Sequence, residues 1–176
     1  MQKLAVAVPV TNHSLHPIMI RQVLYAFICL ACLALVGCAT SFNREFNRIN
    51  NQESRHDRHG ITGPWQGTWR SGGNGHHGEL RCLVEDCSLL ASLKPNVPGL
   101  FRFRYHATYL GLFSATYQVS HIVRPTNNGY EFNGNQKLTG LGGGLYHYEG
   151  RVMNREFRAT YRSASDHGVF EMKRPD

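Results

Sequence analysis

The stretch FRFRYHATY, residues 101–109, decides the fold, because aromatic or small residues alternate with polar ones at every position. A period of two is typical of a β-strand with one buried face and one hydrated face. Shorter runs with the same alternation occur at residues 65–70, 80–84, 113–119, 130–134, 146–150, 157–162 and 170–173. Turn sequences rich in Gly, Asn or Pro separate most of them, including PTNNG at 125–129. The pattern therefore predicts an all-β domain of eight strands.

Consecutive strands joined by such short connections pair antiparallel, which gives an up-and-down meander. If the sheet stayed open, its aromatic face and its two edges would be exposed. Closure into a small barrel removes both problems, and eight strands enclose an interior that side chains fill or that holds one small ligand. We therefore predict a closed eight-stranded barrel over residues 64–176, after an N-terminal signal helix and a polar tether.

Composition excludes several other classes of protein. The chain has 176 residues, of which 18% are charged and 11% aromatic, with 18 glycines. These fractions do not fit an acidic or polar disordered chain. The glycines show no period of three, which excludes a collagen helix. The chain is therefore expected to fold as one small globular domain with an N-terminal extension.

The N-terminal region predicts export. Residues 23–36, VLYAFICLACLALV, form an apolar run that follows Arg21 and is shorter than the roughly 20 residues of a membrane span. A basic residue before such a run is typical of a secretory signal. Met19 lies just before the basic residue and is the expected start of translation, so residues 1–37 are interpreted as leader and signal peptide.

The sequence Leu35-Val36-Gly37-Cys38 resembles the bacterial lipobox, in which a signal peptidase cuts before a cysteine that carries lipid. The resemblance implies lipidation of Cys38 and anchorage to a membrane. Ala39 stands where the family has a retaining aspartate for the inner membrane, which implies the outer membrane. The part of the chain after cleavage has seventeen basic and twelve acidic residues, a net charge of +5.

Residues 38–63 are polar and are expected to be a lipid-anchored tether. Phe42, Phe46 and Ile49 in this segment lie at positions i, i+4 and i+7, which would form one stripe of a short helix. The solvated tether is slightly favoured over the helix.

Cys82 and Cys87 are the two cysteines that remain after the lipid site, and an exported domain favours pairing them. We expect a disulfide across the four intervening residues, with two free thiols as the alternative. Zinc is disfavoured, because no second pair of ligands has matching spacing.

The segment Gly67-Thr68-Trp69 resembles the Gly-x-Trp signature of lipocalins and related calycin barrels. In those families a basic residue near the end of the last strand packs over the tryptophan and closes the barrel. The resemblance assigns this role to Arg174, which shares the parity of Phe170 and Met172. The chain lacks the long first loop and the C-terminal helix of lipocalins, so the expected fold is lipocalin-like.

No catalytic motif is present in the sequence, so we expect no enzymatic activity and no cofactor. The histidines are scattered, and a metal site is not predicted. Arg102, Arg104, Arg158 and Arg162 have outward parity and the aromatic residues of the strands have inward parity, so no stacking platform for nucleic acid is expected.

The aromatic residues of inward parity either fill the barrel or line a pocket for an apolar ligand. Small residues of the same parity, such as Ala107 and Ala115, favour a pocket. The expected function is a non-enzymatic, outer-membrane lipoprotein that binds a small apolar ligand. The alternatives are an envelope inhibitor or protein-interaction module acting through the loop 85–99, or a structural envelope protein. The expected pocket residues are Phe103, Tyr105, Tyr117, Phe132, Tyr146, Tyr148, Tyr161 and Phe170.

Overall fold

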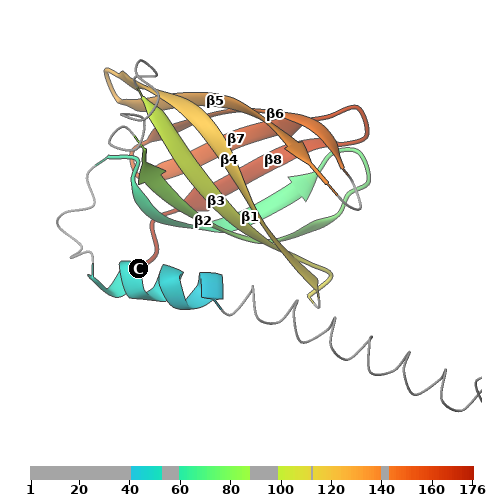
Figure 1. The fold of residues 1–176 in the computed structure, drawn as a ribbon, viewed down its shortest axis with the longest axis horizontal. Coiled ribbons are helices and arrows are strands. Elements are labelled where there is room, and N and C mark those ends of the chain that lie inside the picture. The colour runs from blue at the N-terminus through green and yellow to red at the C-terminus, as the bar shows by residue number, and fades with distance from the viewer. Residues whose placement is uncertain (1–40, 53–59, 88–98, 112, 140–142) are drawn as a thin grey trace, which may run out of the picture. The chain divides into compact units, whose positions relative to one another are not determined.

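The computed structural model describes residues 41–52, 60–87, 99–111, 113–139 and 143–176. Within these ranges a helix at residues 41–52 is followed by eight strands (Figure 1). The strands are β1 (Gly63–Ser71), β2 (His77–Asp86), β3 (Leu100–Tyr109), β4 (Phe113–Thr126), β5 (Gly129–Leu138), β6 (Gly144–Met153), β7 (Glu156–Arg162) and β8 (His167–Lys173).

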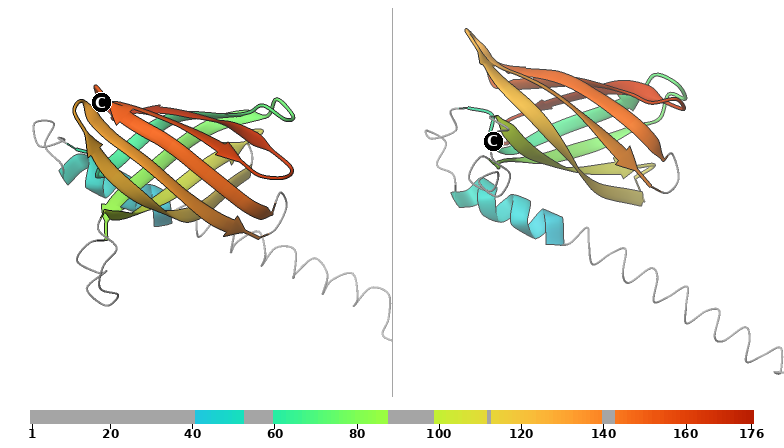
Figure 2. Two further views of the ribbon diagram at one scale, coloured as in Figure 1. Left: turned by 90° about the horizontal axis from the view of Figure 1, so that it is seen from above. Right: turned by 45° about the horizontal axis from the view of Figure 1, so that its top comes forward.

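Each strand pairs antiparallel with the next one in the sequence, and β8 pairs antiparallel with β1. The predicted meander of eight strands closed into a barrel is therefore confirmed. Burial alternates along the strands as the sequence pattern requires, most clearly in β7 and β8, where every second residue is buried. Figure 2 shows the tilted strands wrapping around one interior.

The barrel has two different ends. The end where β1 and β3 finish and β2 and β4 begin is called the open end. At the opposite end, called the closed end, β1 begins and the chain finishes after β8. There the buried guanidinium of Arg174 lies 3.9 Å from the ring centroid of Trp65. It also donates hydrogen bonds to the carbonyl oxygens of Pro64, Gly60 and Thr62 at 3.0, 2.8 and 2.6 Å.

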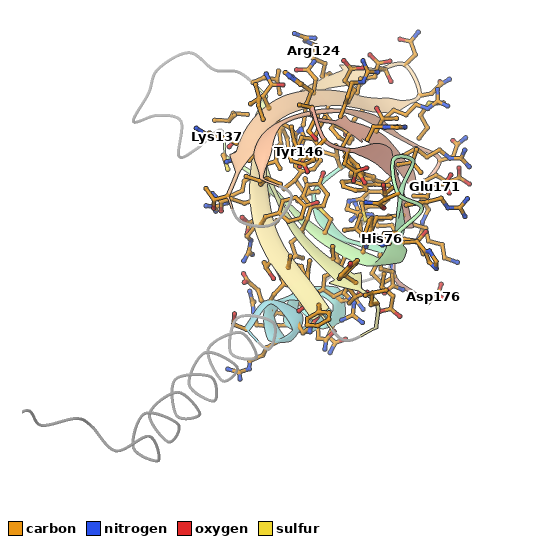
Figure 3. The ribbon with its side chains drawn as sticks, turned by 90° about the vertical axis from the view of Figure 1, so that its right-hand side faces the viewer. His76, Arg124, Lys137, Tyr146, Glu171 and Asp176 are labelled. Carbon is orange, nitrogen blue, oxygen red and sulfur yellow. The ribbon has the colours of Figure 1, made fainter. Side chains whose placement is uncertain are left out.

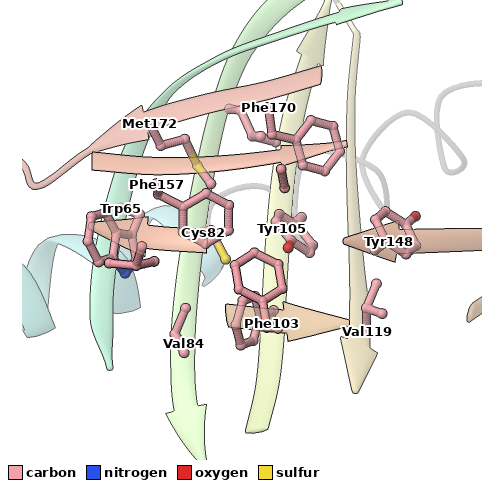
Figure 4. Packing of buried hydrophobic residues seen from close by; sticks show 14 of the residues in the cluster. Trp65, Cys82, Val84, Phe103, Tyr105, Val119, Tyr148, Phe157, Phe170 and Met172 are labelled. Carbon is pink, nitrogen blue, oxygen red and sulfur yellow. The ribbon is translucent and has the colours of Figure 1, made fainter. Parts of the chain in front are cut away.

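The half of the barrel next to Trp65 is filled by aromatic side chains (Figure 4). The ring centroid of Phe103 lies 4.9 Å from that of Phe132 and 6.0 Å from that of Phe157. These rings are at most 3% exposed, and Cys82 and Met172 pack in the same cluster. Burying rings of this size is the main favourable contribution to folding. This half has the close packing of a protein core.

His121 is the polar side chain in this cluster. It is completely buried, its ring centroid lies 4.3 Å from that of Phe103, and neither ring nitrogen has a hydrogen-bond partner. Burial lowers its pKa to about 4. The nearby backbone of Asn133 has a smaller effect in the opposite direction and raises the pKa. Gly134 makes room for the ring, because a Cβ atom there would lie 2.8 Å from Nδ1 of His121.

We expect the domain to lose stability as the pH falls from about 6.5 to 4. In this range the unfolded chain binds a proton at His121 and the folded chain does not, so acid favours the unfolded state. The loss is expected to reach about 2–3 kcal/mol between pH 7 and pH 4. Urea unfolding across this range should show a much smaller slope for His121→Leu. The exposed control His167→Leu should keep the wild-type slope, and an unchanged slope in His121→Leu would contradict the prediction.

The wall of the barrel is incomplete between β4 and β5. Pairing of β3 with β4 runs the full length from Leu100↔Ile122 to Tyr109↔Phe113. Pairing of β4 with β5 stops at Ile122↔Asn133, although both strands continue to the open end. The strands diverge beyond this point (Figure 1). The described parts of the two strands therefore leave a split in the wall, and it reaches the open end.

The helix at residues 41–52 lies on the outer surface of β2 and β3. Phe42 and Phe46 are at most 3% exposed and pack with Leu83, an outward residue of β2 that is itself fully buried. The predicted stripe of Phe42, Phe46 and Ile49 is present, so the favoured interpretation of residues 38–63 as a solvated tether is wrong for residues 41–52. The barrel also begins before residue 64, because Ile61 belongs to its core and β1 starts at Gly63.

Polar contacts fix the direction of the helix. Phe42 stacks on His106 at a centroid distance of 5.1 Å, and Glu45 pairs with Arg104 at 2.8 Å. Because His106 is nearer the open end than Arg104, the helix starts towards the open end and runs antiparallel to β3. Among the described residues, no helix has both the length and the apolar character needed to cross a membrane.

Candidate ligand-binding cavity

The open half of the barrel contains a cavity of about 370 Å³. Figure 3 looks in from this side, with Tyr146 inside the ring of strands and Arg124 and Glu171 at the outer surface. Space remains because Ala107 and Ala115 provide small side chains where the closed half has large rings. The lining residues are Trp69, Ala107, Ala115, Thr116, Tyr117, Leu138, Thr139, Tyr146, Tyr148, Tyr161, Asp166 and Phe170.

The cavity separates the eight predicted pocket residues into two groups. Five of them line it: Tyr117, Tyr146, Tyr148, Tyr161 and Phe170. The other three, Phe103, Tyr105 and Phe132, are at most 3% exposed in the packed core below it and do not line it. Inward parity was therefore correct for all eight residues, but only those in the open half face a cavity.

The tyrosines form a continuous aromatic wall. The centroid of Tyr146 lies 6.2 Å from that of Tyr148 and 6.1 Å from that of Tyr161, and Tyr161 lies 5.1 Å from Phe170. Burial raises the pKa of Tyr148, with the neighbouring Tyr146 adding to the shift. Burial also raises the pKa of Tyr117. These phenols are therefore neutral at physiological pH and offer hydrogen bonds without charge.

Asp166 is a cavity residue that sequence reasoning missed. Its Oδ1 accepts hydrogen bonds from Ser71 Oγ at 2.6 Å and from the backbone N–H of His167 at 2.8 Å, and its Oδ2 accepts one from Tyr161 Oη at 3.0 Å. Three donors hold this carboxylate in one orientation. Burial, followed by the nearby carboxylate, raises the pKa of Tyr161.

The β7–β8 connection holds Asp166 in place through a local turn. Ser163 Oγ accepts hydrogen bonds from the backbone N–H groups of Ser165 and Asp166 at 3.2 and 3.0 Å. The backbone N–H of Ser163 in turn donates to the carbonyl oxygen of Asp166 at 2.7 Å. Serine favours such turns because its hydroxyl bonds to the backbone two or three residues later. The Ser-x-x-Asp spacing of residues 163–166 was the sequence signal that could have predicted this turn and the position of Asp166.

Trp69 does not have the role that the lipocalin resemblance assigned to it. Its Nε1 donates to the carbonyl oxygen of Thr108 at 2.8 Å, and its ring lines the cavity in the open half. Arg174 instead stacks on Trp65 at the closed end. Trp65 also belongs to a Gly-x-Trp sequence, Gly63-Pro64-Trp65, which lies four residues before Gly67-Thr68-Trp69 on β1. The predicted closure by Trp69 and Arg174 is therefore corrected to Trp65 and Arg174.

The expected disulfide between Cys82 and Cys87 is absent, and both cysteines are free and buried. The reason is that β2 continues to Asp86, so the segment between them is extended strand and not a loop. The four extended residues between them place their Cα atoms roughly 16 Å apart, whereas a disulfide needs about 4.4–6.8 Å. Burial raises the pKa of Cys82 well above its usual value, which makes this thiol unreactive.

Two wider depressions, of about 530 and 540 Å³, lie on the outer wall, the first over β4–β8 and the second over β6–β8 and the end of β1. Charged side chains line them, including Arg151, Glu149 and Arg162. The described residues contain no group of three His, Cys, Asp or Glu side chains placed to hold a metal ion. The interior cavity is therefore the more suitable place for an apolar ligand, because it lies inside the barrel and is walled by rings.

Two other sequence predictions fall outside the described ranges. Cys38, the expected lipid site, precedes residue 41, and most of the loop 85–99, the expected contact of an inhibitor, lies in residues 88–98. Comparison with known proteins found no family model, no curated protein and no solved structure that matches this chain.

Proposed function

We propose that this protein binds a small, largely apolar molecule in the cavity at the open end of its barrel and acts as a carrier or sensor, not as an enzyme. The observation that carries the proposal is the contrast between the two halves of the barrel. The closed half is packed with rings, whereas the open half keeps about 370 Å³ behind a wall of tyrosines. That volume is within the roughly 300–1,000 Å³ of small-molecule sites.

The split between β4 and β5 supports this function, because it borders the cavity. Thr116 and Tyr117 on β4 and Leu138 on β5 line the cavity on either side of the split. A ligand entering sideways would separate no strand pairs, since pairing between β4 and β5 ends at Ile122↔Asn133. Among the described residues beyond that pair, β4 is bonded only to β3 and β5 only to β6, so moving β4 and β5 apart costs less than opening a complete ladder of hydrogen bonds.

The proposal predicts that an apolar fluorescent probe binds with micromolar affinity and that Tyr117→Trp weakens this binding. Tyr117 lines the cavity and stacks on Tyr105 at a centroid distance of 5.3 Å, so a larger ring there would take up ligand space. We expect at least about a fivefold increase in Kd, because overpacking a binding site costs on the order of 1 kcal/mol or more.

The matched control is Phe113→Trp, which enlarges a ring that is 62% exposed on the same strand and outside the cavity lining. Its Kd should equal that of the wild type. Circular dichroism and thermal unfolding should show that both variants keep the fold. Absence of probe binding to the wild-type protein would overturn the proposal.

We also propose that a lipid on Cys38 anchors the protein to the outer membrane. The support is the lipobox-like sequence before Cys38 and the apolar run that precedes it. Mass spectrometry of the protein extracted from membranes should find a chain that starts at Cys38 and carries a diacylglycerol. Cys38→Ala should remain unprocessed, and a processed Cys38→Ala protein retained in the membrane would contradict this assignment.

A further inference from the structure

We propose that the ligand of the cavity is an organic cation, an ammonium group attached to an apolar body. The inference rests on the proposed binding function and adds the charge of the ligand. It comes from the chemical character of the lining residues, which present aromatic faces, neutral phenols and a single carboxylate.

Within the described ranges, the lining of the cavity contains one acidic side chain and no basic side chain. Of the described residues that line it, Asp166 is the only one with a carboxylate side chain, and none is Lys, Arg or His. The basic residues nearest in sequence, such as Lys137 on β5 and Arg162 on β7, have outward parity and are exposed. A ligand carboxylate or phosphate would therefore meet a like charge inside the cavity and no cation to pair with.

The carboxylate of Asp166 is oriented by hydrogen bonds and could accept a cation as a further partner. The bonds from Ser71, Tyr161 and the backbone of His167 fix its orientation; Oδ1 accepts two of them, whereas Oδ2 accepts one and keeps a lone pair for a ligand. No basic side chain in the described part of the chain forms an ion pair with it. A bound ammonium group would supply the missing positive charge.

The rings beside Asp166 suit the same ligand. Tyr161, which bonds to Asp166, stands next to Tyr146 and Phe170, and Trp69 lines the same cavity. Aromatic faces attract cations through their quadrupole, and cages of such rings bind ammonium groups in other proteins. Since most of the remaining lining is aromatic or aliphatic, the cation must carry an apolar body to fill the space.

Three water-soluble ligands that share one hydrocarbon body test the inference: phenylpropylamine, phenylpropanol and phenylpropanoate. They are titrated into the full chain in lipid nanodiscs by calorimetry, with empty nanodiscs as the blank. We expect the protonated amine to bind at least about tenfold more tightly than the alcohol, and the carboxylate to bind most weakly, as for a hydrogen bond to a charged group.

Asp166→Asn should reduce the affinity for the amine by about tenfold or more and leave the affinity for the alcohol within about twofold. The control Glu149→Gln removes the same charge from an exposed, outward position next to Tyr148 and should change neither. The comparison of the three ligands on the unmodified protein does not depend on the folding of either variant.

The outcomes separate this inference from the function on which it rests. If the alcohol or the carboxylate binds as tightly as the amine, the cation inference is overturned and the binding function stands. If the amine preference persists unchanged in a folded Asp166→Asn protein, the role of Asp166 is overturned. If neither the three ligands nor the apolar probe binds, the proposed function fails together with the inference.

Discussion

Replacing Arg174 with alanine is expected to lower the free energy of unfolding by about 4 kcal/mol, because a buried guanidinium that joins three carbonyl groups would be lost. Its hydrogen bonds to the carbonyl oxygens of Gly60, Thr62 and Pro64 join the segment after β8 to the start of β1 and to the residues just before it. The carbonyl of Pro64 would be left buried and without this donor. The variant would also lose the cation–π contact with Trp65.

Chemical unfolding followed by tryptophan emission would measure the loss. The control Arg162→Ala removes an exposed arginine from the outer wall and should change stability by less than about 0.5 kcal/mol. Arg174→Lys keeps the charge but lacks the planar fork, and it should recover only a small part of the loss. Equal stability of Arg174→Ala and Arg162→Ala would show that the closed end does not depend on this residue.

Gly67→Ala is expected to destabilise the barrel by at least about 3 kcal/mol, since it adds a methyl group at the seam between β1 and β8. A Cβ atom at residue 67 would lie 2.7 Å from Cα of Met172 and would overlap the carbonyl oxygen of Glu171. Both atoms belong to the backbone of β8, so no change of side-chain rotamer relieves the clash. The strands that close the barrel would have to separate.

Thr68→Ala is the matched control, because Thr68 neighbours Gly67 on the same strand, pairs with Glu171 and has an exposed side chain. Its expected loss is below about 1 kcal/mol, which reflects the lower β-propensity of alanine. Thermal unfolding of both variants would compare the two effects. A Gly67→Ala protein as stable as Thr68→Ala would mean that the seam is not tightly packed.

The sequence was sufficient to predict the strands and their faces, because the period of two is a local property. Phe103 and Tyr105 lie inward and Arg102 and Arg104 outward, as the alternation required. Closure was also predicted, because it covers the apolar face and removes both edges of the sheet. The helix stripe of Phe42 and Phe46 was visible too, but its burial depends on the outward side chain of Leu83 on β2, against which it packs.

Features that depend on long-range register were not predictable. Gln66↔Lys173 is the last recorded pair between β1 and β8, and one more step brings Arg174 opposite Trp65 and not opposite Trp69. That register depends on the lengths of all the strands and turns between residues 66 and 173. The same is true of the cavity. Tyr105 and Tyr148 have the same parity, and only the arrangement of the rings decides that Tyr148 faces open space and Tyr105 does not.

The direction of the helix on the barrel wall determines how an anchored molecule would face its membrane. Cys38 precedes the first helical residue by three positions, and three residues span at most about 10 Å. The helix begins towards the open end, where Leu110 and Phe113 on the β3–β4 hairpin are each 62% exposed. A lipid on Cys38 would therefore hold the mouth of the barrel against the leaflet. Ligands would then be exchanged with the lipid phase, and solubility in water would not limit which molecules reach the cavity.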